Sequence, residues 1–221
     1  MIRNLSLSLI LVTCFSPMNA AEPESHDATA VASQESALAA AAVLLKRFWP
    51  MLQQNPSHYG LSPSDSIEAL GFGSPLELQG ITDEGLRRYQ IGEPVMTISE
   101  PTGQWFVPLV AGGAWRAMVQ VRDRGQGSWQ GYGIGWAPLA KKWEAITRRW
   151  PATEQGGPQL FTVYSLPDYY FSVPSVSPPN LTEMPSLELN AEGSVPLESQ
   201  LNSASTAIEG LRKEIDIGTE H

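Results

Sequence analysis

The chain has 221 residues, enough for one folded domain, and carries a formal net charge of −9. The charge is uneven: residues 35–173 hold 11 basic and 12 acidic side chains, so most of the acidic excess lies in the flanking segments. A central part without basic excess argues against nucleic acid as the main partner.

The N-terminal segment has the layout of a secretory signal peptide, which we assign to residues 1–21. Arg3 precedes an apolar run over residues 5–12, and small residues follow at Ala20 and Ala21. The run is shorter than the roughly 20 residues of a membrane span. We therefore expect an exported chain, periplasmic or extracellular, with no integral membrane segment in its mature form.

Cys14 is the only cysteine, and it lies inside this segment. The letters LVTC resemble a bacterial lipobox, so a lipoprotein anchored through Cys14 is the alternative to ordinary cleavage. After ordinary cleavage the mature chain has no cysteine, which excludes disulfides, thiolate metal sites and cysteine nucleophiles. Residues 22–34 are small and polar, which predicts a flexible leader.

Three helical or turn segments are predicted before the sheet. Residues 36–50 have apolar positions at helical spacing, and Pro50 should end that helix. Residues 62–71 predict a second helix, with Ser62 as its N-cap. Residues 77–94 predict a short strand followed by a turn or helix that Thr82 caps.

Beyond these segments the pattern changes to the alternation of β-strands. Four strand-like runs follow one another over residues 94–100, 104–112, 114–123 and 128–136, joined by the short links PTG, GG and RGQG. Links of this length predict antiparallel pairing. An amphipathic helix over residues 137–150 comes next, and two further strand-like runs, 159–166 and 169–174, close the domain.

The predicted fold is therefore a single α+β domain over residues 35–173. Its antiparallel meander of about four to six strands is packed by helices on one face. Cystatin-like and PepSY-like modules are similar in this general plan, an analogy at the level of fold that carries no function. Residues 174–221 are acidic and contain no aromatic residue, which predicts a disordered tail with at most one short helix at STAIEGLRKEID.

The stretch GSWQGYGIGW raises the question of a phosphate-binding loop. Its glycines follow the spacing G-x-G-x-G, not the G-x-G-x-x-G of a dinucleotide site, and the strands before it are joined by hairpins. We interpret it as a strand on which the glycines share one face and let a helix or ring pack closely. The alternative is the floor of a ligand groove. The residues concerned are Gly131, Gly133 and Gly135, with Trp129 and Tyr132 as the candidate ligand-binding aromatics.

The helix over residues 137–150 carries four basic side chains: Lys141, Lys142, Arg148 and Arg149. The plain interpretation is a solvated face whose long side chains cover apolar surface. Two alternatives stay open, an anion such as phosphate or anionic lipid, and the docking of the acidic tail.

Catalytic residues are few. His58 is the single histidine of the domain, and neither a G-x-S-x-G elbow nor an HExxH motif occurs. The carboxylates that could act in a site are Asp83, Glu84, Glu93 and Asp123. No metal or cofactor is expected. The favoured hypothesis is an exported, non-catalytic binding or assembly module for a protein, peptide or glycan, and the alternative is a small hydrolase, or an inhibitor-like regulator of one, that uses His58.

Overall fold

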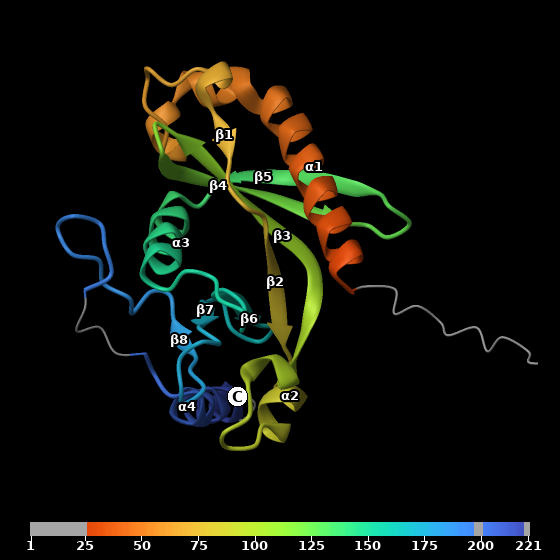
Figure 1. The fold of residues 1–221 in the computed structure, drawn as a ribbon, viewed down its shortest axis with the longest axis vertical. Coiled ribbons are helices and arrows are strands. Elements are labelled where there is room, and N and C mark those ends of the chain that lie inside the picture. The colour runs from red at the N-terminus through yellow and green to blue at the C-terminus, as the bar shows by residue number, and fades with distance from the viewer. Residues whose placement is uncertain (1–25, 197–200, 219–221) are drawn as a thin grey trace, which may run out of the picture.

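The computed structural model describes residues 26–196 and 201–218. These residues form one eight-stranded sheet with four α-helices (Figure 1). The helices are α1 (His26–Gln54), α2 (Asp83–Arg88), α3 (Ala137–Arg149) and α4 (Ala204–Gly218). The strands are β1 (Gly71–Phe72), β2 (Leu76–Ile81), β3 (Ser99–Ala111), β4 (Ala114–Asp123), β5 (Trp129–Gly135), β6 (Gln159–Val163), β7 (Tyr169–Ser172) and β8 (Thr182–Glu183). The predicted signal peptide and Cys14 lie outside the described residues.

The sheet consists of two antiparallel units joined by one parallel pair. Its strand order is β5-β4-β3-β2-β6-β7-β8, and β1 pairs with β3. Strands β2 to β5 follow one another in sequence and in space, so the α+β class and an antiparallel run of strands are confirmed. The parallel pairing of β2 with β6 was not predicted. The sheet has eight strands, whereas about four to six were expected, and the short strands β1 and β8 were not predicted.

Helices cover both faces of the sheet, whereas the sequence predicted helices on one face only. In β3, Phe106 is buried on the side of α3, while its neighbours Trp105 and Val107 are buried on the side of α1. The central strands are apolar at successive positions, which is typical of strands that are buried on both faces. A one-sided sheet would leave one of these two sets in water.

Three apolar clusters fill the space between sheet and helices. The α3 core contains Leu78, Phe106, Met118, Leu139, Trp143, Ile146, Leu160 and Phe171, among others. The α1 core contains Ala41, Leu44, Leu45, Trp105, Val107, Leu109, Val119 and Val121, among others. The α4 core contains Ile81, Leu86, Phe161, Val163, Tyr170, Ile208, Leu211 and Ile215, among others.

The C-terminal segment packs into the domain, which differs from the disordered tail expected over residues 174–221. Leu187 and Val195 are buried in the α3 core, and α4 buries one apolar stripe in the α4 core. The acidic composition of this segment concealed the stripe, because the average over many residues hides a few apolar side chains at helical spacing. The short helix expected near its end is present as α4.

The N-terminal helix is longer than predicted. It includes residues from His26 onwards, which belong to the leader expected to be flexible. It continues past Pro50 to Gln54. The predicted helix over residues 62–71 is instead a turn, in which the Asp65 carboxylate accepts a hydrogen bond from the Ser62 backbone N–H at 2.8 Å, followed by a 3-10 turn. Ser and Asp side chains favour such local turns over helix.

Two further local predictions had different outcomes. Thr82 caps α2 as expected, because its hydroxyl oxygen accepts a hydrogen bond from the Gly85 N–H at 2.9 Å. The link Pro101–Gly103, expected to be a turn, lies inside β3, where Gly103 has a φ of +68°. A glycine at this φ lets the strand continue through a local distortion, because the left-handed region is open to it.

One side chain fastens the C-terminal helix to the rest of the domain. Arg212 of α4 donates from Nε to the Leu86 carbonyl oxygen at 2.7 Å and from Nη2 to the carbonyl oxygens of Arg87 and Tyr89 at 3.1 Å each. These carbonyls lie at the C-terminal end of α2, where a helix leaves its last acceptors without internal partners. Helices α2 and α4 consequently lie side by side (Figure 1).

We predict that Arg212→Met lowers the free energy of unfolding by about 1–3 kcal/mol, because the partly buried carbonyls lose a charged donor. Urea unfolding of the whole chain measures the change. Lys213→Met is the matched control, since Lys213 is exposed and pairs with Glu209 on its own helix, so its loss should change stability by less than about 0.5 kcal/mol. Equal unfolding midpoints for the two variants would contradict the proposed role of Arg212.

Candidate functional site

Strand β5 forms one edge of the sheet and contains a bulge. It pairs with β4 alone among the described strands, and the register shifts so that Val121 lies opposite Gly131 while Gln120 lies opposite Gly133. Tyr132 is the extra residue between these two pairs. The bulge interrupts the alternation, so the prediction that Gly131, Gly133 and Gly135 share one face is wrong. Gly131 faces α1, and the other two face the side of α3.

The glycines of β5 allow two different close contacts. A Cβ atom at Gly131 would lie 2.7 Å from the Cβ of Leu44, so α1 approaches the strand at this point. A Cβ atom at Gly133 would lie 2.8 Å from the Cη2 of Trp136, so a ring covers that position on the opposite face. The predicted packing role is thus confirmed for Gly131 and Gly133, with a helix at one and an indole at the other.

A groove of about 430 Å³ runs between α1 and β5. It is lined by Ser36, Ala39, Ala40, Val43, Leu44, Arg47, Gly127, Trp129, Gln130 and Gly131. Trp129 forms one wall and contacts Trp105 edge to face, with ring centroids 5.8 Å apart. The opposite wall consists of small helical side chains and of Val43, which is 70% exposed. We refer to this feature as the α1–β5 groove.

Two exposed aromatic side chains lie on the other face of the sheet at β5: Tyr132 of the strand and Trp136, which follows it as the N-cap of α3. We call them the aromatic face. The Tyr132 hydroxyl donates to Oε1 of Gln104 at 2.7 Å, and the Arg122 guanidinium lies 5.6 Å from the centre of its ring. Burial raises the pKa of the Tyr132 hydroxyl, and the charge of Arg122 opposes that rise. Trp136 packs edge to face on Phe106, which fixes its ring against the sheet.

The predicted ligand-binding residues are therefore divided by the sheet. Trp129 and Gly131 line the α1–β5 groove, whereas Tyr132 and Gly133 lie with the aromatic face. Both sets adjoin the same free strand edge.

The four basic residues of α3 do not act as one surface. Lys142 donates from Nζ to the carbonyl oxygens of Met184 and Pro185 at 2.7 and 3.0 Å, so it contacts the C-terminal segment. Burial lowers the pKa of Lys142, and Glu188 opposes that effect. Docking of the C-terminal segment on this helix thus involves Lys142 and mainly backbone acceptors.

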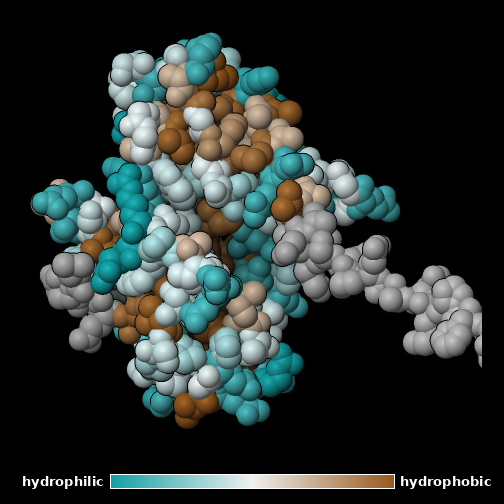
Figure 2. All heavy atoms as spheres, viewed as in Figure 1, coloured by the Kyte–Doolittle hydropathy of each residue, from teal (hydrophilic) through white to brown (hydrophobic). Residues whose placement is uncertain are grey.

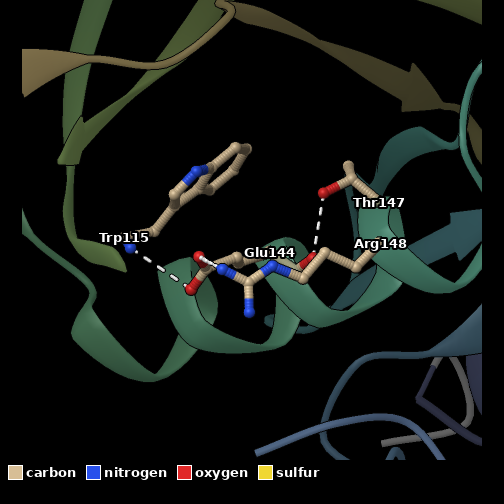
Figure 3. Close-up of polar contacts among 4 residues, drawn as sticks. All are labelled: Trp115, Glu144, Thr147 and Arg148. Atoms are coloured by element: carbon tan, nitrogen blue, oxygen red, sulfur yellow. Dashed lines mark hydrogen bonds and ion pairs between the residues drawn. The ribbon is translucent and has the colours of Figure 1, made fainter. Parts of the chain in front are cut away.

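The other three basic residues have different surroundings. Arg148 pairs with Glu144 at 2.6 Å (Figure 3), and Arg149 stacks on the neighbouring Trp150 ring. Lys141 is exposed. Lys141, Arg148 and Arg149 are all exposed, and Arg149 covers an apolar ring, so the solvated-face interpretation fits these three side chains.

His58 is exposed, and its ring contacts Tyr59 edge to face. Within the described residues no carboxylate pairs with it. Three of the four candidate carboxylates have hydrogen-bond partners away from His58, and Glu84 is exposed. Asp83 accepts from the Ser165 hydroxyl and Asp123 from the Gly125 N–H. Glu93 accepts from the Gln90 N–H. In residues 26–196 and 201–218, no three His, Cys, Asp or Glu side chains are grouped so as to hold a metal ion.

A second cavity, of about 510 Å³, lies beside β2 and was missed by sequence reasoning. Figure 2 shows a hollow at the centre of the visible face, with hydrophobic residues at its bottom. The polar residues that line the cavity include Glu77, Gln79 and Gln159, and the aromatic ones are Trp115 and Trp143. We refer to it as the β2 cavity. The sequence feature that could have indicated this cavity is the strand LELQGI, in which two polar residues alternate with apolar ones in the middle of a domain.

Glu77 is half-buried in this cavity. Its Oε2 accepts a hydrogen bond from Nε2 of Gln79 at 3.2 Å. Burial raises the pKa of the Glu77 carboxyl above its usual range, and the hydrogen bond from Gln79 partly offsets that rise. A carboxyl that loses solvation without a compensating cation is a common feature of binding sites.

No protein-family model, curated protein or solved structure matches this chain. None of the described helices combines the length and the hydrophobicity needed to cross a membrane. Function is therefore inferred from the geometry of the groove, the aromatic face and the cavity.

We predict that Gly131→Ala lowers the free energy of unfolding by about 1–3 kcal/mol, because the new methyl group would force α1 away from β5. Thermal and urea unfolding measure the effect. Gly71→Ala is the control, since no atom lies within 4 Å of its added Cβ, and its stability should stay close to that of the parent protein. If Gly131→Ala unfolds with the same free energy as the parent protein, the packing of α1 on β5 does not depend on this close contact.

Proposed function

We propose that the protein is an exported, non-catalytic binding module that captures an extended segment of a partner protein along the free edge of β5. The observation that carries the proposal is that binding surfaces lie on both sides of this edge. An unpaired strand edge is a template for a further strand, and here it lies between the α1–β5 groove and the aromatic face.

The geometry suits an added strand on both sides. Side chains of an extended segment point alternately to the two faces of the sheet it joins. Those on the α1 side would enter the groove, where Ala39 and Ala40 leave room for them. Those on the other side would meet Tyr132 and Trp136, whose rings supply large contact areas.

The charges around the edge favour an acidic segment. Arg47 lines the groove, Arg122 lies over Tyr132, and Arg124 donates to Oε1 of Gln130 at 2.8 Å. None of the three forms an ion pair within the described parts of the chain. Aspartate or glutamate side chains in the partner would provide the missing counter-charge and speed the encounter.

The alternative of a hydrolase that uses His58 has less support. That mechanism needs a group that orients or activates the imidazole, and the contact that His58 makes is with the Tyr59 ring. No observation places a second catalytic side chain beside it, so binding is the function that the geometry supports better.

Val43→Asp tests the position of the binding site. The side chain lies on the wall of the groove and is largely exposed, so the substitution should repel an acidic segment without unfolding the domain. Peptides selected from a random display library on the parent protein should be acidic, and they should bind this variant at least about tenfold more weakly.

Val31→Asp is the matched control for this experiment. Val31 is a 55% exposed valine of the same helix, outside the groove lining, so the helix receives the same residue and the same charge. Binding should then equal that of the parent protein. Equal retention of the selected peptides by the two variants would remove the groove from the proposal.

Export is tested by the N-terminus of the recovered protein. Expressed in a bacterium from Met1, the chain should be recovered outside the cytoplasm with a new first residue, Ala21 or Glu22, by N-terminal sequencing. Leu9→Arg should block processing, because a charge interrupts the apolar run. Recovery of the parent chain with Met1 intact contradicts export, and a mature chain that starts at Cys14 supports the lipoprotein alternative.

A further inference from the structure

A pocket of about 310 Å³ lies at the β8 end of the sheet, where helix α4 meets strands β7 and β8 (Figure 1). Tyr170 of β7 lies directly opposite Glu183 of β8, so the two side chains are neighbours on one face of the sheet. Helix α4 covers that face, because Tyr170 packs with Ile208 and Leu211 in the α4 core. We refer to this feature as the β8–α4 pocket.

Two carboxylates line this pocket from opposite walls. Glu183 belongs to the sheet, and Glu214 belongs to α4, three residues after Leu211, which also lines the pocket. Neither carboxylate takes part in an ion pair within the described residues. No basic side chain occurs among the described lining residues. The pocket therefore presents negative charge without a cation.

The two basic side chains of α4 bind elsewhere. Arg212 donates to the Leu86 carbonyl oxygen at the end of α2, and Lys213 pairs with Glu209 at 2.8 Å. Neither lines the pocket. Within the described parts of the chain, no side chain supplies the counter-charge that the two carboxylates of the pocket lack.

The Tyr170 hydroxyl is a third polar group of the pocket. Its side chain is only 6% exposed, and the hydroxyl forms no hydrogen bond within the described residues. Burial raises the pKa of this hydroxyl well above its usual range, and the charges of Glu183, Asp168 and Glu214 raise it further. The oxygen thus lies near both carboxylates of the pocket. A buried phenol without a hydrogen bond is unfavourable, and a ligand in the pocket would provide the missing partner.

We propose that the β8–α4 pocket binds a guanidinium group, whose charge is countered by Glu183 on one side and Glu214 on the other. A guanidinium is planar and has five N–H donors, so it can donate to both carboxylates and to the Tyr170 oxygen at once. An ammonium ion is a more strongly hydrated point charge and loses more water on entry. The aliphatic stem of the ligand packs on the apolar part of the lining, Leu181 and Leu211.

This site goes beyond the proposed capture of an extended segment at β5. Strands β5 and β8 stand at opposite ends of the strand order, and the β8–α4 pocket shares no lining residue with the α1–β5 groove. The two sites also differ in charge, since arginine side chains surround the β5 edge and carboxylates line the pocket. Each can therefore be tested without the other.

N-acetyl-L-arginine methylamide and its citrulline analogue are the probes, because the urea of citrulline keeps the shape of a guanidinium without its charge. In a proton–nitrogen NMR titration of the whole protein, the arginine compound should shift the backbone N–H signal of Gly210, which lines the pocket, in a saturable way. Loss of that signal in Gly210→Ala assigns it, and the added Cβ meets no atom within 4 Å. The citrulline compound should bind at least about tenfold more weakly.

Ethylguanidinium distinguishes the two sources of such a group. Binding as tight as that of the arginine compound indicates a free small molecule. Weaker but saturable binding indicates an arginine side chain of a polypeptide, whose backbone adds contacts.

Glu183→Gln and Glu214→Gln should each lower the affinity for the arginine compound at least about fivefold, because each removes one of the two countercharges. Tyr170→Phe should lower it about threefold through the loss of one acceptor. Glu192→Gln is the matched control, with the same loss of charge at an exposed position outside the pocket, and it should bind as the parent protein does. The spectrum of each variant reports whether the fold is intact.

Three results would each overturn the proposal. The first is equal binding of the arginine and citrulline compounds. The second is parent-like affinity in both Glu183→Gln and Glu214→Gln. The third is an unshifted Gly210 signal at tens of millimolar of the arginine compound.

Discussion

The fold depends on burying both faces of β3. This strand has 13 residues, pairs with β1, β2 and β4, and is apolar at successive positions through its middle. Side chains on such a strand point to both sides, so a layer of helices on one side leaves half of them in water. Helix α1 covers one face and α3 the other. The close approach of α1 at Gly131 follows from the same requirement.

The sequence predicted those elements whose apolar pattern is continuous. Helix α3 has Leu139, Trp143 and Ile146 on one stripe, and it lies where expected. Strands β4 and β5 also occupy the predicted residues, because their turns carry glycine. In these places local preference and tertiary burial agree.

The predictions from sequence were wrong where tertiary contacts outweigh local composition. Helix α4 lies in an acidic segment, yet Ile208, Leu211 and Ile215 form a buried stripe that only a partner surface stabilises. The bulge at Tyr132 depends on the register between two strands, which no single strand reveals. The sequence indicates only weakly that Glu77 lies beside a cavity. That position depends on where β6 pairs with β2, and β6 comes much later in the chain.

The free edge of β5 and the β2 cavity both lie where strand pairing stops. At β5 the sheet ends, and among the described residues no strand pairs with its outer edge. At the start of β2 the pairing with β6 has not begun, and the space beside the strand is left open. A sheet closed in both places would offer neither an edge nor a cavity. The free edge and the open space therefore both arise from incomplete pairing of an otherwise well-packed sheet.

The position of α4 along the chain has a consequence for folding during synthesis. Its apolar stripe completes the α4 core with residues of β2, α2, β6 and β7, all of which leave the ribosome earlier. Until residue 204 has emerged, that face of β6 and β7 lacks its cover, and the hydrogen bonds from Arg212 to the end of α2 join positions more than a hundred residues apart. Contacts of such long range form late and slowly. The α4 core therefore stays incomplete until the last helix of the described chain has been synthesised.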